Sequence, residues 1–431
     1  MVAIRRSFVS DLSRRIGQEV CVRGWVFRLR VLARTTFIIL KDCTGTIQCV
    51  GATADLHTHH LKLDDAVEIT GTIREESRAH NGIELDVTAV QILNRTAQIL
   101  PFHSSSDVAA VGSDILLDYR PLALRSDRIG DIFRIQAAIL RYFREFLTAN
   151  HFTEIISSKI VSGGTEGGTN LFAIRYFERV AYLAQSPQFY KEHGVAGFER
   201  VFETGHVYRA EPHATSRHLT EYYSLDLEMG FIDGPEDVIQ LERELLSHIF
   251  ERLNLDYKDT LAKFRTAPLP SMMRVPIWTF DDCLDRLRLK LDRNDLVDDL
   301  DPEAERQLCR MAQEECDVPA VFVLGFPLAA RPFYTHPRTE TRAAGFDLLY
   351  DGLEITTGGQ RLHLREDLER SLTSRGISPE SFESHLKMFE IGMPPHGGLA
   401  IGLERLTAQV LGLSNIREAT LYPRDRYRLT P

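Results

Sequence analysis

Residues 17–95 contain five short apolar runs separated by turn-forming segments such as residues 42–45 and 81–82, and this feature constrains the fold most. Runs of this length, rich in β-branched residues, are typical of strands. Five strands in so short a segment predict a small Greek-key barrel, most commonly an OB-fold. We therefore expect an OB-fold domain over residues 1–100. The runs are "EVCVRGWVFRLR", "TTFIILKD", "GTIQCVGA", "AVEITGTIREE" and "GIELDVTAVQIL".

Two patterns in this barrel suggest nucleic-acid binding. OB-folds often stack bases on aromatic side chains beside cations, and Phe27 and Phe37 lie among Arg23, Arg28, Arg30 and Arg34. Residues 1–50 also carry nine Arg/Lys against three Asp/Glu, whereas residues 51–100 carry four against eight. Core packing would explain the aromatic residues equally well, and a scattered solvated surface would explain the charges. Nucleic-acid binding and these simpler explanations therefore both stay open at this point.

The remaining sequence predicts a different kind of domain. Residues 101–127 are small and polar and are typical of a hinge or linker. From residue 128 onward, two amphipathic helical patterns are mixed with strand-like stretches, which indicates an α+β domain with an antiparallel sheet flanked by helices. It would span residues 128–431, with an insertion at about 258–325 to which the sequence assigns no role. No GxGxxG or GxxxxGK[ST] phosphate loop is present.

Composition excludes several classes of protein. A chain of 431 residues suggests two or three domains, and a net charge of −10 argues against nonspecific coating of nucleic acid. No window is apolar enough for a membrane span, and the N-terminus has no secretory apolar region. The six cysteines form no CxxC pair. We expect a cytoplasmic protein with reduced thiols, no structural zinc and no membrane partner.

Charged residues gather in several segments of the second domain. In "RAEPHATSRHLTEYYSLDLEMGF", residues 209–231, a polar loop precedes a strand that places Asp226 and Glu228 on one face. Arg209, Arg217 and Arg405 are suited to phosphate oxygens, aided by a predicted helix start near Gly402. Oxygen ligands for Mg²⁺ would come from Glu228, Asp347 and Glu354.

Three further residues would hold a smaller ligand. Lys191 and Arg361 could fix a second anion, and Asp226 could hold an ammonium group. The sum is a site for a nucleotide, Mg²⁺ and a small zwitterion with an extra carboxylate. Each residue alone has a simpler explanation, since exposed ion pairs are common and contribute less than about 1 kcal/mol. Only their joint occurrence favours a site.

The ordered set of motifs resembles the class II aminoacyl-tRNA synthetases, in particular the aspartyl enzymes of the compact archaeal type. The similarity runs from about residue 17 to the end of the chain. It is carried by "TEGGTNLF", "QSPQFYK", "RAEPHATSRHL", "GLEITTGGQR" and "MPPHGGLAIGLERL". The resemblance implies a reaction in which ATP activates L-aspartate, which is then transferred to the 3′ end of tRNA(Asp).

The resemblance also implies roles for individual residues. Arg209 and Arg405 would stabilise the reacting phosphates, and Glu354 and Thr357 match the family's Mg²⁺ and nucleotide ligands. Glu228 is added to this metal site only because its carboxylate suits Mg²⁺. ATP would contact Arg209, Ala210, Glu211, Arg217, His218, Leu219, Glu354, Thr357, Gly402, Leu403, Glu404 and Arg405. Aspartate would contact Glu166, Gln188, Phe189, Tyr190, Lys191, Arg209, Asp226, Thr357 and Arg361.

In the resembled family the barrel reads the anticodon, and Phe37 and Gln48 match positions that contact its middle base. Strict enzymes carry tryptophan and lysine where this chain has Phe27 and His80. We therefore expect relaxed charging of both tRNA(Asp) and tRNA(Asn), with a tRNA-dependent amidotransferase as a further partner. The alternatives are a strictly tRNA(Asp)-specific enzyme and an asparaginyl-tRNA synthetase, against which Lys191 and Asp226 argue.

Three departures from the family pattern have consequences. Ser158 replaces the proline that the family places at its dimer interface, so the expected homodimer is less securely predicted. Thr357 replaces a serine and keeps the hydroxyl group. Pro212 replaces an acidic residue in the loop after Arg209, which would alter contact with the tRNA acceptor end.

Overall fold

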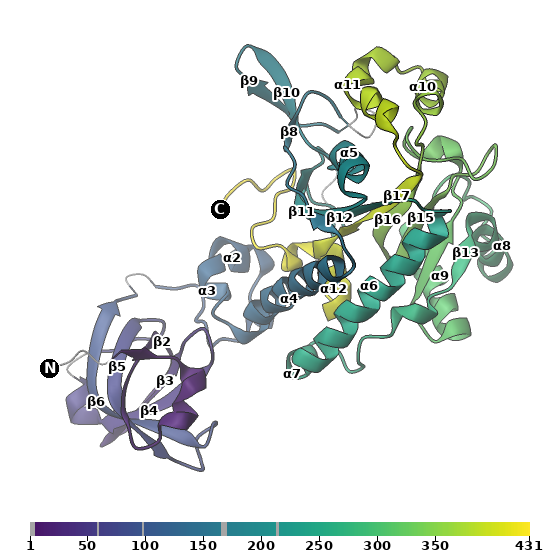
Figure 1. The fold of residues 1–431 in the computed structure, drawn as a ribbon. Helices are drawn as coiled ribbons and strands as arrows, with labels where there is room; N and C mark the ends of the chain where they lie inside the picture. The colour runs from purple at the N-terminus through teal and green to yellow at the C-terminus, as the bar shows by residue number, and fades with distance from the viewer. Residues whose placement is uncertain (1–4, 58–59, 97–98, 165–169, 213–214) are drawn as a thin grey trace. The chain divides into compact units, whose positions relative to one another are not determined.

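The computed structural model describes the chain except residues 1–4, 58–59, 97–98, 165–169 and 213–214. It divides into two compact units, residues 1–130 and 131–431, which are described separately here (Figure 1). Among the described residues, no helix combines the length and apolar composition needed to cross a membrane.

The first unit contains the predicted barrel. Its strands follow the order β1-β2-β3-β4-β6-β5, and an additional pairing of β2 with β5 closes the sheet on itself. The short helices η1 (Val9–Arg15) and α1 (Thr53–His57) accompany it. The strands are β1 (Arg6–Ser7), β2 (Glu19–Val31), β3 (Thr35–Lys41), β4 (Thr46–Ala52), β5 (Ala66–Glu75) and β6 (Ile83–Asn94). The five predicted strands and the OB-fold class are thereby confirmed.

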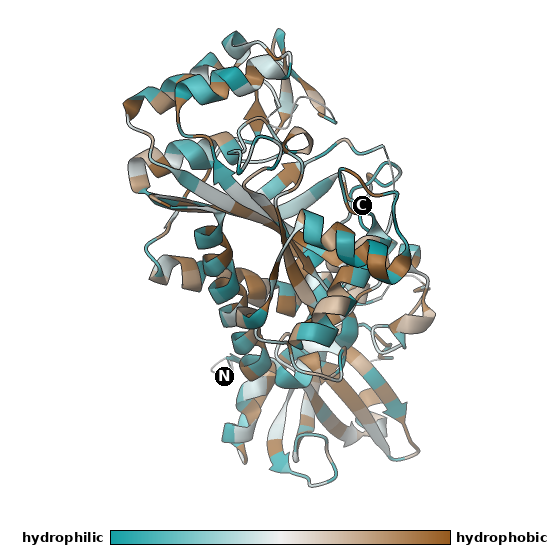
Figure 2. Ribbon diagram, turned by 90° about the vertical axis from the view of Figure 1, so that its right-hand side faces the viewer, coloured by the Kyte–Doolittle hydropathy of each residue, from teal (hydrophilic) through white to brown (hydrophobic). Residues whose placement is uncertain are grey.

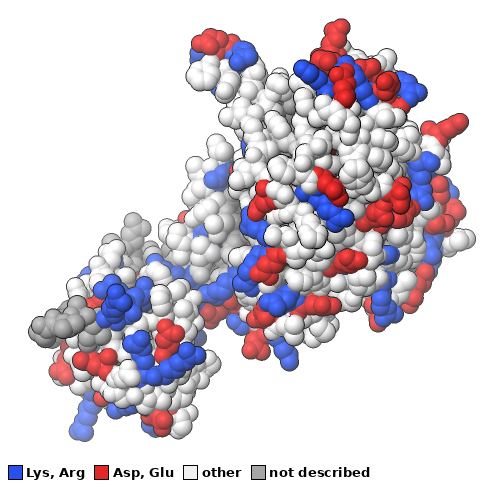
Figure 3. Space-filling model, viewed as in Figure 1, with Lys and Arg blue, Asp and Glu red and all other residues white. Residues whose placement is uncertain are grey.

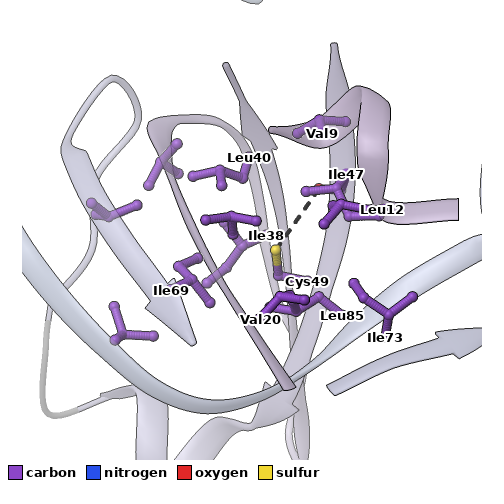
Figure 4. Packing of buried hydrophobic residues seen from close by; sticks show 14 of the residues in the cluster. Val9, Leu12, Val20, Ile38, Leu40, Ile47, Cys49, Ile69, Ile73 and Leu85 are labelled. Atoms are coloured by element: carbon purple, nitrogen blue, oxygen red, sulfur yellow. Dashed lines mark hydrogen bonds between the residues drawn. The ribbon is translucent and has the colours of Figure 1, made fainter. Parts of the chain in front are cut away.

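Alternation along these strands builds the barrel core. In β3, Thr36, Ile38 and Leu40 are buried, whereas the residues between them are partly exposed. The inward side chains of all five long strands form one apolar cluster (Figure 4). Gly71 allows a close approach of β6, because a Cβ there would lie 2.1 Å from the carbonyl oxygen of Asp86. A strand bulge occurs at this point of the β5–β6 pairing.

Residues 101–127 contain more structure than a linker composition predicts. They include η2 (Val108–Ala110), α2 (Ser113–Asp118) and α3 (Arg120–Ala123). Val108, Leu117 and Leu122 are buried, but these helices have only 3, 6 and 4 residues, which is too short to show a helical period in the sequence. The long helix α4 (Asp127–Ala149) follows and crosses the boundary between the two units.

An eight-stranded sheet forms the centre of the second unit, in the order β13-β14-β15-β16-β17-β12-β11-β7. Its pairings are antiparallel except for β13–β14 and β7–β11 at the two edges. The predicted antiparallel sheet flanked by helices is thus confirmed. The strands are β7 (Thr153–Glu154), β11 (Arg200–Tyr208), β12 (Glu221–Gly230), β13 (Ile277–Thr279), β14 (Ala320–Leu324), β15 (Gly345–Tyr350), β16 (Leu353–Arg361) and β17 (His396–Gly402).

Helices cover this sheet. The buried side of α6 (Pro235–Asp256) carries Val238, Ile239, Leu245 and Leu246, and Figure 2 shows apolar and polar residues alternating along the helices. The others are α5 (Gln188–Phe198), α7 (Lys258–Leu261), α8 (Phe280–Leu291), α9 (Pro302–Cys316), α10 (Arg365–Ser374), α11 (Glu383–Leu386) and α12 (Leu403–Leu411). A small separate sheet joins β8 (Ile160–Val161), β10 (Arg179–Leu183) and β9 (Ala173–Tyr176).

The segment expected as an insertion belongs to the same sheet. It supplies β13 and β14 at one edge and packs α8 and α9 over them. An apolar cluster joins these helices to the strands through Trp278, Phe280, Leu308 and Val323. The insertion is therefore continuous with the body of the second unit, which brings its polar residues within reach of the central strands.

Candidate active site

A cavity of about 490 Å³ opens in the second unit over strands β12, β16 and β17. Its walls come from α5, from the loop after β11 and from the start of α12. Segments distant in sequence meet there because the central strands β16, β17 and β12 lie side by side. Most of the predicted site residues line this cavity, with cations at both ends.

Lys191 lies at the buried end of the cavity. Its Nζ lies 3.0 Å from Asp226 Oδ1 and donates to the carbonyl oxygen of Leu399 at 3.0 Å. Both charged side chains are only 1% exposed. Ser224 Oγ donates to the other oxygen of Asp226 at 2.5 Å. Lys191 and Asp226, which were expected to bind opposite charges of one small ligand, contact each other in the folded chain.

Arg361 lies beside this pair and is also buried. Its Nε donates to Glu228 Oε1 at 3.0 Å, and one Nη donates to the carbonyl oxygen of Gly398 at 3.0 Å. Glu228 Oε2 lies 3.4 Å from Lys191 Nζ. Both oxygens of Glu228 thus face cations, so this geometry does not fit the predicted magnesium role, and Glu228 instead holds Lys191 and Arg361.

Gly398 makes this close packing possible. A Cβ at this position would lie 2.1 Å from the carbonyl oxygen of Leu227 and 2.3 Å from Glu228 Oε2. Neither atom can move away, because the carbonyl belongs to the central strand and the carboxylate is held by Arg361. A glycine is therefore required for Arg361 and Glu228 to lie at this depth.

Only two of the four residues 188–191 that are predicted to contact aspartate line the cavity from helix α5. Gln188 and Lys191, one turn apart, line the cavity, whereas Phe189 and Tyr190 do not belong to its lining. Phe189 stacks on His385 with ring centroids 4.0 Å apart, and Tyr190 is 37% exposed. Successive helical residues point about 100° apart, so these two side chains point away from the cavity lining, and their contact with aspartate stays a prediction.

A buried polar group that the sequence did not reveal lies behind Gln188. Its Nε2 donates to Glu192 Oε1 at 2.7 Å, and Glu192 Oε2 lies 3.2 Å from His385 Nε2. Burial alone would raise the pKa of Glu192, but the neighbouring His385, His396 and Gln188 hold it at about 2. His385 is distant in sequence, so only the fold could bring it to Glu192.

The loop after β11 carries the cations of the other end. Arg209, Glu211, Arg217, His218 and Leu219 all line the cavity. The Arg209 guanidinium lies 5.7 Å from the ring centroid of Tyr222, and the backbone N–H of Ala210 donates to the carbonyl oxygen of Asn170 at 2.7 Å. Glu166 falls outside the described residues.

Arg405 and Glu354 meet at this end. Arg405 Nη1 donates to the carbonyl oxygen of Glu354 at 2.9 Å and lies 3.2 Å from its Oε1. Gly402 caps α12 and Leu403 is buried in its first turn, which places Arg405 as predicted. Glu404 also lines the cavity, but both of its oxygens accept from the backbone N–H of Tyr223 at 3.1 Å. Its burial raises its pKa to about 7.

The oxygen donors at this end fit a magnesium ion that is shared with a substrate. Thr357 Oγ1 donates to Glu354 Oε1 at 3.1 Å, and Asp347 pairs with Thr357 in register on the adjacent strand. In the described part of the chain, no group of three or more His, Cys, Asp or Glu residues could hold a metal. Mg²⁺ usually binds one or two carboxylates together with substrate phosphates, so Glu354 and Thr357 suit it.

Arg331 is a cavity residue that sequence reasoning missed. It donates two parallel hydrogen bonds to Asp347, at 3.0 and 2.6 Å, and stacks over Phe326 with a distance of 3.9 Å. Burial raises the pKa of Asp347 despite this pairing. The only available signal was an arginine in "ARPFY", which carries no periodicity or charge cluster.

The predicted anticodon residues lie in the first unit. Register pairs Phe37 with Arg30 of β2, and Gln48 with Ile39 of β3. Gln48 Nε2 donates to Glu84 Oε2 at 2.8 Å. Lys41 Nζ lies 4.6 Å from the ring centroid of Phe27, whereas His80 is exposed in the β5–β6 turn. Figure 3 shows basic and acidic side chains standing together on the visible face of the barrel.

Comparison with known proteins matches both units. Residues 112–426 match the family described as class II tRNA synthetases (D, K and N), and residues 20–93 match the OB-fold nucleic acid binding domain. The aspartate–tRNA(Asp/Asn) ligase of Thermus thermophilus is 42% identical over 430 residues, covering 99% of this chain and 100% of the relative. The aspartate–tRNA(Asp) ligase of Pyrobaculum aerophilum is 37% identical over 96% of each chain.

Solved structures agree with this assignment. The asparaginyl-tRNA synthetase of Pyrococcus horikoshii with asparaginyl-adenylate has a TM-score of 0.90 at 28% identity, covering 100% of both chains. The aspartyl-tRNA synthetase of Entamoeba histolytica has a TM-score of 0.87 at 28% identity, covering 100% of this chain and 93% of that one. The chain therefore belongs to the class II tRNA synthetases of the D, K and N group, with an OB-fold domain before the catalytic domain.

Proposed function

We propose that the protein is an aspartate–tRNA ligase. It activates L-aspartate with ATP and transfers the aspartyl group to the 3′ end of tRNA. The observation that carries this proposal is the cavity with buried Lys191 and Arg361 at one end and Arg209, Arg217 and Arg405 at the other. The first pair suits a small anionic side chain, and the second set suits a triphosphate.

The choice of aspartate over asparagine rests on charge. Lys191 and Arg361 are held by Asp226 and Glu228 but still line the cavity. A carboxylate placed there would gain two charge-assisted hydrogen bonds, whereas a neutral amide would gain weaker ones. The sequence relatives named above are aspartate ligases, which also supports aspartate. Charging of tRNA(Asp) with labelled aspartate tests the proposal, and a protein that transfers asparagine instead would refute it.

The reaction needs no covalent enzyme intermediate. An oxygen of the aspartate α-carboxylate attacks the α-phosphorus of ATP in line, the bond to the bridging oxygen breaks, and pyrophosphate leaves with the electron pair. Arg209 stabilises the charge that develops on the α-phosphate, and Arg217 and Arg405 hold the leaving phosphates. A ribose hydroxyl of the terminal tRNA nucleotide then attacks the mixed anhydride and releases AMP. Positioning and electrostatics account for both steps.

Glu354 and Thr357 would hold Mg²⁺, which when bound neutralises charge on the phosphates of ATP. Asp226 orients Lys191, and its predicted contact with the substrate ammonium group would share the oxygen that accepts from Ser224. Gln188 contributes a neutral hydrogen-bonding group. Glu166 completes the aspartate site in this proposal. Thr357 also lines the cavity and would contribute its hydroxyl group to aspartate.

Relaxed tRNA selection is part of the proposal. Phe27 and His80 stand where strict enzymes of the family carry larger or cationic groups, and the Thermus thermophilus relative is named for both tRNA(Asp) and tRNA(Asn). The barrel of residues 1–100 would read the anticodon through Phe27, Phe37, Gln48 and His80. An amidotransferase would then convert Asp-tRNA(Asn). Purified protein that charges tRNA(Asp) but leaves tRNA(Asn) uncharged would refute relaxed selection.

We further propose a cytoplasmic homodimer. Ile156 is 96% exposed and Ile160 is 47% exposed, on either side of Ser158, the position that the family places at its dimer interface. Large apolar side chains on a surface often mark an interface. Light scattering tests this assignment, and a monomer at micromolar concentration would refute it.

A further inference from the structure

The loop that carries Arg217 is fixed at defined points. Thr215 Oγ1 accepts from the backbone N–H of Arg217 at 3.2 Å, and the backbone N–H of Ile416 donates to the carbonyl oxygen of Ser216 at 3.0 Å. These contacts hold the backbone on either side of the guanidinium-bearing residue. The long side chain of Arg217 still has several rotatable bonds and needs its own support to stay in one orientation.

That support comes from helix α9. Arg217 Nη1 donates to Glu305 Oε2 at 2.6 Å, and Nη2 donates to the carbonyl oxygen of Gly352 at 2.8 Å. Two donors of one planar group are thus held by two separate elements, α9 and the β15–β16 turn. This fork fixes the plane of the guanidinium group at the wall of the cavity.

Glu305 is built into the fold and does not line the cavity itself. It is 9% exposed and lies in the first turn of α9, where Asp301 caps the helix by accepting from two backbone N–H groups. Burial raises the pKa of its carboxyl group to about 7, and Arg217 opposes that rise. Arg217 therefore favours the charged form of this buried carboxyl group, and the carboxylate in turn holds the Arg217 guanidinium in place.

We propose that Glu305 is a positioning residue that holds Arg217 ready for the triphosphate of ATP, so that the helical insertion takes part in nucleotide binding. This inference rests on the proposed function only in naming the nucleotide as ATP. An arginine already held in place loses less rotamer freedom when it binds phosphate. No sequence pattern connects residues 258–325 with the cavity, whereas the contact between Glu305 and Arg217 does so directly.

The test measures ATP–pyrophosphate exchange at saturating aspartate with ATP varied. We expect Glu305→Gln to raise the KM for ATP about tenfold, within the range found for coupled charged pairs, with kcat and the KM for aspartate close to wild type. The matched control is Glu314→Gln, which removes an exposed carboxylate of the same helix that pairs with Lys290. The control should behave as wild type.

A double-mutant cycle separates positioning from a general structural role. Because Glu305 acts through Arg217, adding Glu305→Gln to Arg217→Ala should raise the KM for ATP no further. An unchanged or lower KM in Glu305→Gln would overturn the inference, as would a full additional rise in the Arg217→Ala background. If wild type showed no aspartate-dependent exchange, the proposed function would be refuted but the role of Glu305 would not. Calorimetric binding of ATP to the same variants would then still measure the effect of Glu305 on ATP affinity.

Discussion

Substitution of Lys191 by methionine removes an ammonium group that both pairs with Asp226 and would bind the side-chain carboxylate of aspartate. Met fills a similar volume but leaves Asp226 without its cation in a site where both side chains are 1% exposed. At 3.0 Å, an effective dielectric constant of 20 gives a pairwise attraction of about 5.5 kcal/mol. Removing one partner of a buried pair typically costs about 3–5 kcal/mol of folding free energy. We expect Lys191→Met to lose stability of this size.

The double variant Lys191→Met, Asp226→Asn distinguishes stability from function. It removes both charges, so most of the lost folding free energy should return, because no uncompensated buried charge remains. Aspartate-dependent exchange should stay absent, since the cation for the substrate side chain is gone. Urea unfolding gives the stabilities, and ATP–pyrophosphate exchange gives the activities. A single variant as stable as wild type, or a double variant that activates aspartate normally, would refute this reasoning.

Three further outcomes follow from the geometry. Burial raises the pKa of Glu242 to about 8, above its unfolded value of about 4.3. The folded state therefore keeps a proton that the unfolded state has lost, so the free energy of unfolding should decrease as the pH rises from about 4.3 to about 8. Glu242→Gln should remove this pH dependence and be more stable than wild type at pH 9 by urea unfolding. Gly398→Ala should cost about 1–3 kcal/mol and abolish exchange, because its Cβ would meet Leu227 and Glu228; normal aspartate binding by calorimetry would contradict this. Arg209→Ala should remove exchange while leaving the thermal unfolding temperature near wild type, and a variant with near-normal exchange would disprove the role of Arg209.

The barrel could be predicted because its strands alternate with a period of two residues. Strands β3 and β5 bury every second side chain over most of their length, and that pattern can be read from adjacent residues. The same period placed Asp226 and Glu228 on one strand face, and the chemistry of Lys191 and Arg361 predicted a second anion site. Local patterns of this kind need no knowledge of distant contacts.

Partners distant in the sequence could not be predicted in this way. Glu228 was expected to hold magnesium, but Arg361 lies 133 residues away and takes the carboxylate. Likewise, Arg217 and Glu305 meet across 88 residues. Phe189 and Tyr190 lie outside the cavity lining for a different reason, because a helix turns the residues of a contiguous motif in different directions. Sequence patterns define faces, whereas the pairing of charges depends on the packed fold.

One cavity is proposed to hold aspartate and ATP together in reacting positions. The decisive measurement is ATP–pyrophosphate exchange with aspartate and with asparagine, side by side. We expect exchange with aspartate at a rate far above that with asparagine, and its loss in Lys191→Met. Equal or faster exchange with asparagine would disprove this site, because the buried cations would then have no part in selecting the amino acid.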